Sequence, residues 1–211
     1  MLSQLRPAVV SLLVLTLVCG VVYPAIVTGV AKVVFPRQAE GSLIERDGKM
    51  VGSKLIGQAF TDPKYFWPRP SATSPTPYNG VAGSGSNLAP SNPALADAVK
   101  QRVEHLRAAD PGNDSPVPVD LVTASASGLD PHVSPAAARY QVPRVARVRG
   151  LAPELVQEMV DRHTEQRFLG VIGEPVVNVL ALNLELDQGA GRGVVSAADG
   201  TAGAGLPMPA R

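Results

Sequence analysis

The chain has 211 residues, a formal net charge of +1 and a single cysteine. A nearly neutral chain without a block rich in Lys or Arg gives no reason to expect nucleic acid as a partner. One cysteine excludes a disulfide framework within the chain and a zinc site built from cysteines. Abundant Gly and Pro, with aromatic residues at 4%, predict a domain rich in loops.

The first predicted element is a membrane-spanning helix, because no charged side chain occurs from Pro7 to Ala31. Such a helix is about 37 Å long and crosses a hydrocarbon core of roughly 30 Å. A cleaved secretory signal is the alternative, but no clear small-x-small site precedes Lys32, so we favour a retained anchor over residues 1–34. Arg6 on one side and Lys32 and Arg37 on the other leave the orientation undecided.

Residues 35–187 are predicted to form a soluble α+β domain. Its first unit is a hairpin in which Leu43-Ile44 and Met50-Val51 flank Asp47-Gly48. A long stretch rich in Pro and Gly follows from Asp62 to Pro93. Since disordered segments are poor in aromatic residues, this stretch is predicted to be ordered by Tyr65, Phe66, Trp67 and Tyr78.

The rest of the domain mixes helices and strands without a regular βαβ alternation, which favours α+β. Asn92-Pro93 opens a helix whose Leu95, Val99, Val103 and Leu106 form one buried stripe. The patterns further predict a strand over Val117–Val122, a helix from Ser134-Pro135 through Tyr140 that Pro143 breaks or restarts, a helix over Pro153–Thr164, and a strand over Val176–Leu186. Residues 188–211 change to a Gly/Ala-rich composition and are predicted to be a flexible tail.

One polar run invites a catalytic interpretation. Ser125, Ser127, Asp130 and His132 lie close in sequence, and an anchored, exported hydrolase using Ser125, Asp130 and His132 is our alternative function. A serine triad needs an oriented imidazole and an oxyanion hole, however, and proximity in sequence supplies neither.

Local structure explains several of these polar residues more simply. Asp130 and Ser134 suit a turn and a helix cap. Asp120, Asp130 and His132 lack the spacing of a known metal site. We therefore assign no catalytic or metal-binding residue.

The same residues carry a resemblance to a known family. The chain resembles the C subunit of the bacterial Kdp potassium-transporting ATPase, from the anchor to Asp187. The matching segments are Val22-Tyr23-Pro24, GSLI at Gly41, GSKLIGQAF from Gly52, YFWPRPSA from Tyr65, YNGVAGSGSNLAPSNP from Tyr78, VPVDLVTASASGLDPHVSPAAARYQVPRVARVRGL from Val117 and GEPVVNVLALNLELD from Gly173.

The resemblance implies a bacterial inner-membrane complex for potassium import. Its implied partners are a channel-like subunit, a P-type ATPase subunit that is phosphorylated by ATP, a very small subunit, and membrane lipid. This chain has no D-K-T-G-T motif of its own, so the resemblance implies a non-catalytic accessory subunit.

The resemblance leaves two roles open. In one, the subunit is a catalytic chaperone that raises the ATP affinity of the ATPase subunit, and Gln141 contacts nucleotide. In the other, the soluble domain lies outside the cytoplasmic membrane, over the potassium entrance, and we favour this periplasmic position. For Gln141, a hydrogen bond at the helix end is the alternative.

The aromatic loop from Tyr65 to Tyr78 is a candidate docking surface. Aromatic residues and Arg69 are favoured at interfaces. The alternative is that these aromatic residues form a small core beneath the loop.

Overall fold

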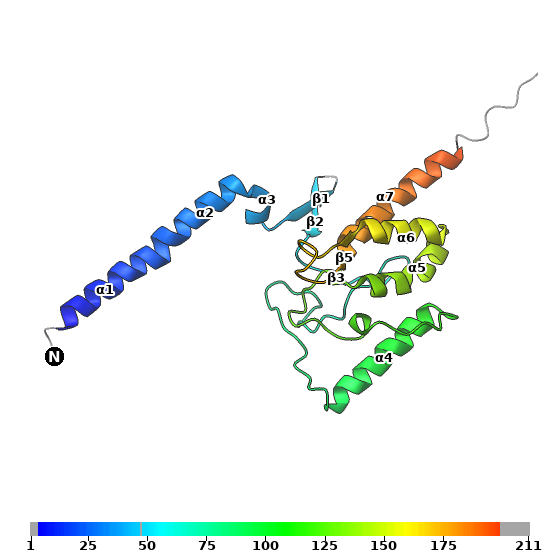
Figure 1. The fold of residues 1–211 in the computed structure, drawn as a ribbon, viewed down its shortest axis with the longest axis horizontal. Helices are drawn as coiled ribbons and strands as arrows, with labels where there is room; N and C mark the ends of the chain where they lie inside the picture. The colour runs from blue at the N-terminus through cyan, green and yellow to red at the C-terminus, as the bar shows by residue number, and fades with distance from the viewer. Residues whose placement is uncertain (1–3, 47, 199–211) are drawn as a thin grey trace, which may run out of the picture. The chain divides into compact units, whose positions relative to one another are not determined.

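The computed structural model describes residues 4–46 and 48–198 of the chain (Figure 1). Contacts between Cα atoms divide the chain into two units, Met1–Leu55 and Ile56–Arg211. The first unit contains the apolar helix and a hairpin, and the second contains the remaining helices and strands. The predicted boundaries at 34/35 and 187/188 stay predictions.

The apolar helix of the first unit runs without a break from Leu5 to Val34. It comprises α1 (Leu5–Leu17), a π-helical turn η2 (Val18–Val22) and α2 (Tyr23–Val34). Pro24 lacks an N–H and crowds the carbonyl of Gly20, and a wider turn at this point accommodates both effects. With a mean hydropathy of 2.5, this is the one helix in the described part of the chain that is long and apolar enough to cross a membrane.

The predicted hairpin is confirmed. After the short helix α3 (Pro36–Ala39), β1 (Leu43–Arg46) pairs antiparallel with β2 (Lys49–Ser53). Gly48 in the turn has φ +72°, a conformation that favours glycine. A register shift between Ile44 and Glu45 marks an irregularity in the ladder.

The second unit is an α+β domain, which confirms the predicted fold class. Its sheet has three short antiparallel strands in the order β3-β5-β4. The elements in chain order are α4 (Pro93–Ala109), the 3-10 turn η3 (Val119–Leu121), β3 (His132–Val133), α5 (Pro135–Arg149), α6 (Pro153–Arg162), β4 (Thr164–Glu165), β5 (Val176–Asn178) and α7 (Val179–Ala198).

Two predicted helix caps are confirmed. The Asn92 side chain accepts a hydrogen bond from Ala94 N at the start of α4, and Ser134 Oγ accepts one from Ala137 N at the start of α5. Each cap satisfies a main-chain donor that has no partner within the helix. The predicted stripe of α4 faces inward, with Leu106 buried.

The predicted strand over Val176–Leu186 is wrong beyond Asn178, where helix α7 begins. The alternating leucines suggested a period of two. The side chains that are buried, however, recur at helical spacing. They are Val179, Leu180, Leu182, Asn183 and Leu186. The helix continues to Ala198, and the remainder of the predicted tail lies outside the described residues.

Two further predictions need correction. Val117–Val122 contains a 3-10 turn, η3, in place of a strand. Helix α5 continues through Pro143 to Arg149, although Pro143 was predicted to break or restart it. Burial of side chains on both sides of Pro143, including Val142 and Val145, offsets the roughly 3 kcal/mol that an interior proline costs.

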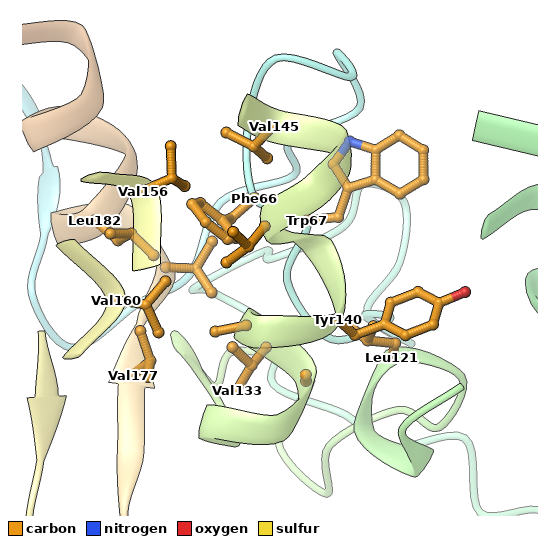
Figure 2. Close-up of a cluster of buried hydrophobic side chains, with 14 of the residues drawn as sticks. Phe66, Trp67, Leu121, Val133, Tyr140, Val145, Val156, Val160, Val177 and Leu182 are labelled. Atoms are coloured by element: carbon orange, nitrogen blue, oxygen red, sulfur yellow. The ribbon is translucent and has the colours of Figure 1, made fainter. Parts of the chain in front are cut away.

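The core of the second unit lies between α5, α6, α7 and β5 (Figure 2). Phe66 lies among Val156, Val160 and Leu182 in this view, although it comes from a segment without helix or strand. Phe66 is 0% and Trp67 is 7% exposed. The loop aromatics at these two positions therefore belong to the core, and they are not available as the docking surface that the sequence suggested.

Candidate functional site

The most elaborate polar arrangement in the second unit holds the main chain of residues 63–67. Four side chains, Gln141, Arg144 and Arg149 of α5 and Asn183 of α7, form what we call the polar clamp. Gln141 and Asn183 are each 1% exposed and Arg144 is 2% exposed. Such buried polar groups are costly unless they are hydrogen bonded.

Two amide side chains bind the main-chain N–H and C=O groups of two consecutive loop residues. Gln141 Oε1 accepts a hydrogen bond from Trp67 N at 2.8 Å, and Gln141 Nε2 donates to Trp67 O at 3.0 Å. Asn183 repeats the pattern with Phe66 N at 2.9 Å and Phe66 O at 3.0 Å. Each amide thus makes the two main-chain hydrogen bonds that a neighbouring β-strand would otherwise make. This explains how a loop without a sheet partner is ordered in the core.

The two arginines complete the clamp. Arg144 donates to the carbonyl oxygens of Pro63 and Tyr65 and, at 2.6 Å, to Gln141 Oε1. Arg149 donates to Lys64 O at 2.6 Å and pairs with Asp187 of α7 at 2.9 Å. Main-chain carbonyls therefore replace much of the water that these guanidinium groups lose.

Burial governs the electrostatics of Arg144. It lowers the pKa of the guanidinium to about 10, although Asp110 acts in the opposite direction. The group still carries its charge at neutral pH. Its Cζ lies 4.2 Å from the centroid of the Trp67 ring, so a cation–π contact adds to the hydrogen bonds.

Gln141, the residue for which the resemblance implies a nucleotide contact, thus lies inside the clamp. Its amide oxygen accepts two hydrogen bonds, and its amide nitrogen donates to Trp67 O and Ala137 O. The hydrogen bond to Ala137 O lies in the interior of α5, whereas the alternative interpretation placed a hydrogen bond at the helix end. A nucleotide contact at Gln141 would require these bonds to open.

The candidate hydrolase residues are not joined into a triad. His132 Nδ1 lies 3.2 Å from Asp130 Oδ1, but Ser125 Oγ instead accepts a hydrogen bond from Gly128 N at 2.9 Å. Among the residues that the structure describes, no hydrogen bond links Ser125 to His132. Ser125 therefore stabilises a turn, and the arrangement does not activate its hydroxyl.

Asp130 lies between His132 and Arg69, and its Oδ2 is 3.4 Å from the Arg69 guanidinium. Burial acts to raise the pKa of Asp130, but hydrogen bonds from His132 and the charge of Arg69 outweigh burial and leave the pKa lowered. Asp120 accepts a hydrogen bond from Ser134 N. Within the described ranges, no group of three or more His, Cys, Asp or Glu residues is placed to hold a metal ion.

An open pocket of about 370 Å³ lies between the loop and α4. Trp67, Arg69, Tyr78, Arg102 and His105 are among its lining residues. His105 stacks on Trp67 with the ring centroids 4.9 Å apart. Gln141 does not line this pocket.

Sequence reasoning missed three members of the clamp. Arg144 and Arg149 lie in a mixed pattern that resembles an ordinary helix surface, and Asn183 lies in the segment that was predicted to be a strand. The available signal was weak: Asn183 is a polar residue at a position whose spacing from Val179, Leu182 and Leu186 is that of a buried helix face.

The chain is similar to proteins of one family over nearly all its length. The model of the family described as "K+-transporting ATPase, c chain" matches residues 5–188. A Potassium-transporting ATPase KdpC subunit of Sorangium cellulosum is 64% identical over 187 residues, which cover 89% of this chain and 98% of that protein. A KdpC subunit of Polaromonas naphthalenivorans is 66% identical over 187 residues, covering 89% and 95%. The chain therefore belongs to the KdpC family, the C chains of potassium-transporting ATPases.

Proposed function

We propose that this chain is a membrane-anchored, non-hydrolytic accessory subunit that assists assembly of the potassium-transporting complex and ATP-coupled potassium import. Family membership supports the role in the complex. The single apolar helix supports attachment to a membrane by one span. The proposed partners are the channel-like subunit, the P-type ATPase subunit and the small subunit of the complex.

The observation that best supports an accessory, non-hydrolytic role for this chain is the polar clamp. The second unit uses buried polar side chains to fix its own loop, and three clamp residues, from α5 and α7, bond to main-chain atoms of that loop. Preorganised structure of this kind lowers the entropy cost of association. ATP enters this proposal through the ATPase subunit.

The anchored hydrolase is not supported as an alternative, because Ser125 and His132 are committed to separate local hydrogen bonds. Replacing Ser125 or His132 by Ala should leave potassium-stimulated ATP hydrolysis of the complex largely intact. Loss of a hydrolytic activity of the chain alone in both variants would instead favour the enzyme.

We further propose that the second unit lies on the periplasmic side. A long domain after a span is translocated largely regardless of the flanking charges. Val81 is 96% exposed, so the cysteine of a V81C variant in a C19A background can be labelled to show on which side of the membrane the second unit lies. Membrane-impermeant maleimide should label it in intact spheroplasts; labelling only after lysis would place the unit in the cytoplasm.

The experiment that tests the function is purification of the tagged full chain from its native membrane in mild detergent. We expect a P-type ATPase and a channel-like subunit to co-purify, with ATP hydrolysis that depends on potassium. Deletion of this chain should abolish that activity. A chain that is recovered alone, together with unchanged potassium-dependent ATPase after deletion, would overturn the proposal.

A further inference from the structure

The open pocket between the loop and α4, which we call the loop–α4 pocket, has the make-up of a small-molecule site. Its volume of about 370 Å³ lies in the range of pockets that bind such ligands. Among the described residues that line it, none belongs to the polar clamp. Large apolar or aromatic side chains form much of the wall, namely Phe60, Trp67, Tyr78, Leu106 and Leu121.

The charged side chains that line the loop–α4 pocket are both cationic. They are Arg69, from the loop, and Arg102, from α4, and no Asp or Glu of the described residues joins them in the wall. Asp130, the ion-pair partner of Arg69, lines a different pocket together with that arginine. The charge of the wall therefore favours an anionic ligand.

Arg102 is the side chain that lacks an anionic partner. It is half-buried, its Nη1 donates to Val122 O at 2.7 Å, and it forms no ion pair with any residue that the structure describes. Burial lowers the pKa of its guanidinium, and no carboxylate acts in the opposite direction. A guanidinium has five N–H donors, so donors remain for a ligand that would supply the missing negative charge.

The wall favours a carboxylate over a phosphate. Phosphate sites usually offer several main-chain N–H groups, from a nest or a helix N-terminus. Pro68, Pro70 and Pro77 line the loop–α4 pocket without an N–H to offer, and the N–H of Trp67 already donates to the clamp. A single planar carboxylate matches the fork of one guanidinium, that of Arg102.

We propose that the loop–α4 pocket binds a small carboxylic acid with an apolar body, whose carboxylate pairs with Arg102 and whose body lies against Phe60 and Leu121. The bound acid then joins the loop to α4, and a ligand of the folded state alone raises the unfolding temperature. This inference does not rest on the proposed function, because it concerns the chain without other subunits.

Trp67 reports on the pocket, since it lines it and is the chain's single tryptophan. The full chain in an uncharged detergent is titrated with 3-phenylpropionate and, separately, with the neutral 3-phenylpropanol. We expect the acid to change the fluorescence saturably with a dissociation constant in the millimolar range or below, and the alcohol to bind about tenfold more weakly. No saturable change, or equal affinity for acid and alcohol, would overturn the proposal.

Arg102→Gln tests the proposed anchor. It removes a charge-assisted hydrogen bond and should weaken binding of 3-phenylpropionate by roughly tenfold or more. Arg107→Gln is the matched control, because Arg107 is exposed on the same helix and does not line the pocket. Unchanged affinity in Arg102→Gln, or an equal loss in both variants, would contradict the assignment.

Ala59→Phe decides the question if Arg102→Gln does not fold. Ala59 is exposed and lines the loop–α4 pocket, so a larger side chain there fills the pocket and leaves the core intact. Without ligand, the variant should unfold at the temperature of the wild type. It should lose the rise in unfolding temperature that 3-phenylpropionate gives the wild type; an undiminished rise would refute the site.

Inorganic phosphate distinguishes the two kinds of anion. At the same concentration as 3-phenylpropionate, and at the same ionic strength in every sample, it should leave the affinity of the acid unchanged. Displacement of the acid by phosphate would show a phosphate site and would overturn the choice of a carboxylate.

Discussion

At the scale of single residues, the second unit depends on side chains that replace missing main-chain partners. Gln141 is the clearest case, because its one amide group bonds to both the main-chain N–H and the C=O of Trp67 and also to Arg144. A buried main-chain group that loses its partner costs about 1–3 kcal/mol. Gln141 therefore has a structural role whether or not nucleotide ever reaches it.

We expect Gln141→Ala to lower the free energy of unfolding by about 2–4 kcal/mol, since it leaves the N–H and C=O of Trp67 unpaired. Thermal unfolding of the full chain in detergent, without nucleotide, measures this effect. Gln101→Ala is the control, because Gln101 is exposed on α4. An unfolding midpoint that changes only when ATP is present would contradict the structural role and favour the nucleotide contact.

Tyr78 makes stability depend on alkaline pH. Burial raises the pKa of its phenol well above the usual value, and its hydroxyl donates to Arg69 O at 2.6 Å. In the unfolded chain the phenol ionises near pH 10. Because the folded state holds the proton more tightly, this contribution to stability is present below about pH 10 and is lost as pH rises above it.

Tyr78→Phe should remove this part of the pH dependence. The variant loses one hydrogen bond, so it should be less stable than the wild type at pH 7. The difference should shrink between about pH 10 and 11. Unfolding by urea at a series of pH values measures both effects; parallel curves for the two proteins up to pH 11 would refute the assignment.

At the scale of elements, helix α5 contains an interior proline that lowers its stability. Pro143 lies in the helix interior and is exposed, whereas Pro153 lies at the first position of α6. Proline removes a hydrogen bond in the interior but none at the first turn.

Pro143→Ala should therefore raise the free energy of unfolding by about 1–2 kcal/mol, a gain smaller than the full interior cost because proline also restricts the unfolded chain. Pro153→Ala, which should give no gain or a slight loss, is the matched control. Urea unfolding of both variants makes the comparison. Equal changes in the two would mean that α5 already compensates for Pro143 fully.

Sequence reasoning succeeded where the determinants are local. The caps at Asn92 and Ser134 and the turn at Gly48 depend on neighbouring residues, and they were predicted. The segment after Asn178 was not, because its leucines fit periods of both two and 3.6. The clamp could not be predicted, since Gln141 and Asn183 lie 74 and 117 positions from their partners in the loop. Only the assembled core brings them together.

At the scale of the whole molecule, one apolar helix is long and apolar enough to hold the chain in a membrane. The span contains no charged side chain from Pro7 to Ala31. Each Arg near the centre of a span opposes insertion by roughly 2.5–3.5 kcal/mol, whereas an Arg near the end reaches the interface and costs little.

The double variant Val14→Arg and Val21→Arg should consequently be extracted from membranes by alkaline carbonate. Val33→Arg, close to the end of α2, should remain with the membrane fraction. Extraction is read by immunoblot of the pellet and supernatant. Retention of the double variant in the pellet would mean that the span is not what holds the chain.

The long sequence separations within the polar clamp also bear on how the molecule folds. Residues 63–67 are held by side chains from α5 and α7 that are synthesised much later. A chain dominated by such distant contacts pays the entropy of loop closure before it gains their energy, and folds slowly compared with a helical bundle. We therefore expect the loop to reach its final order only after α7 has been made, and Phe66 and Trp67 to be accessible to chaperones and proteases until then.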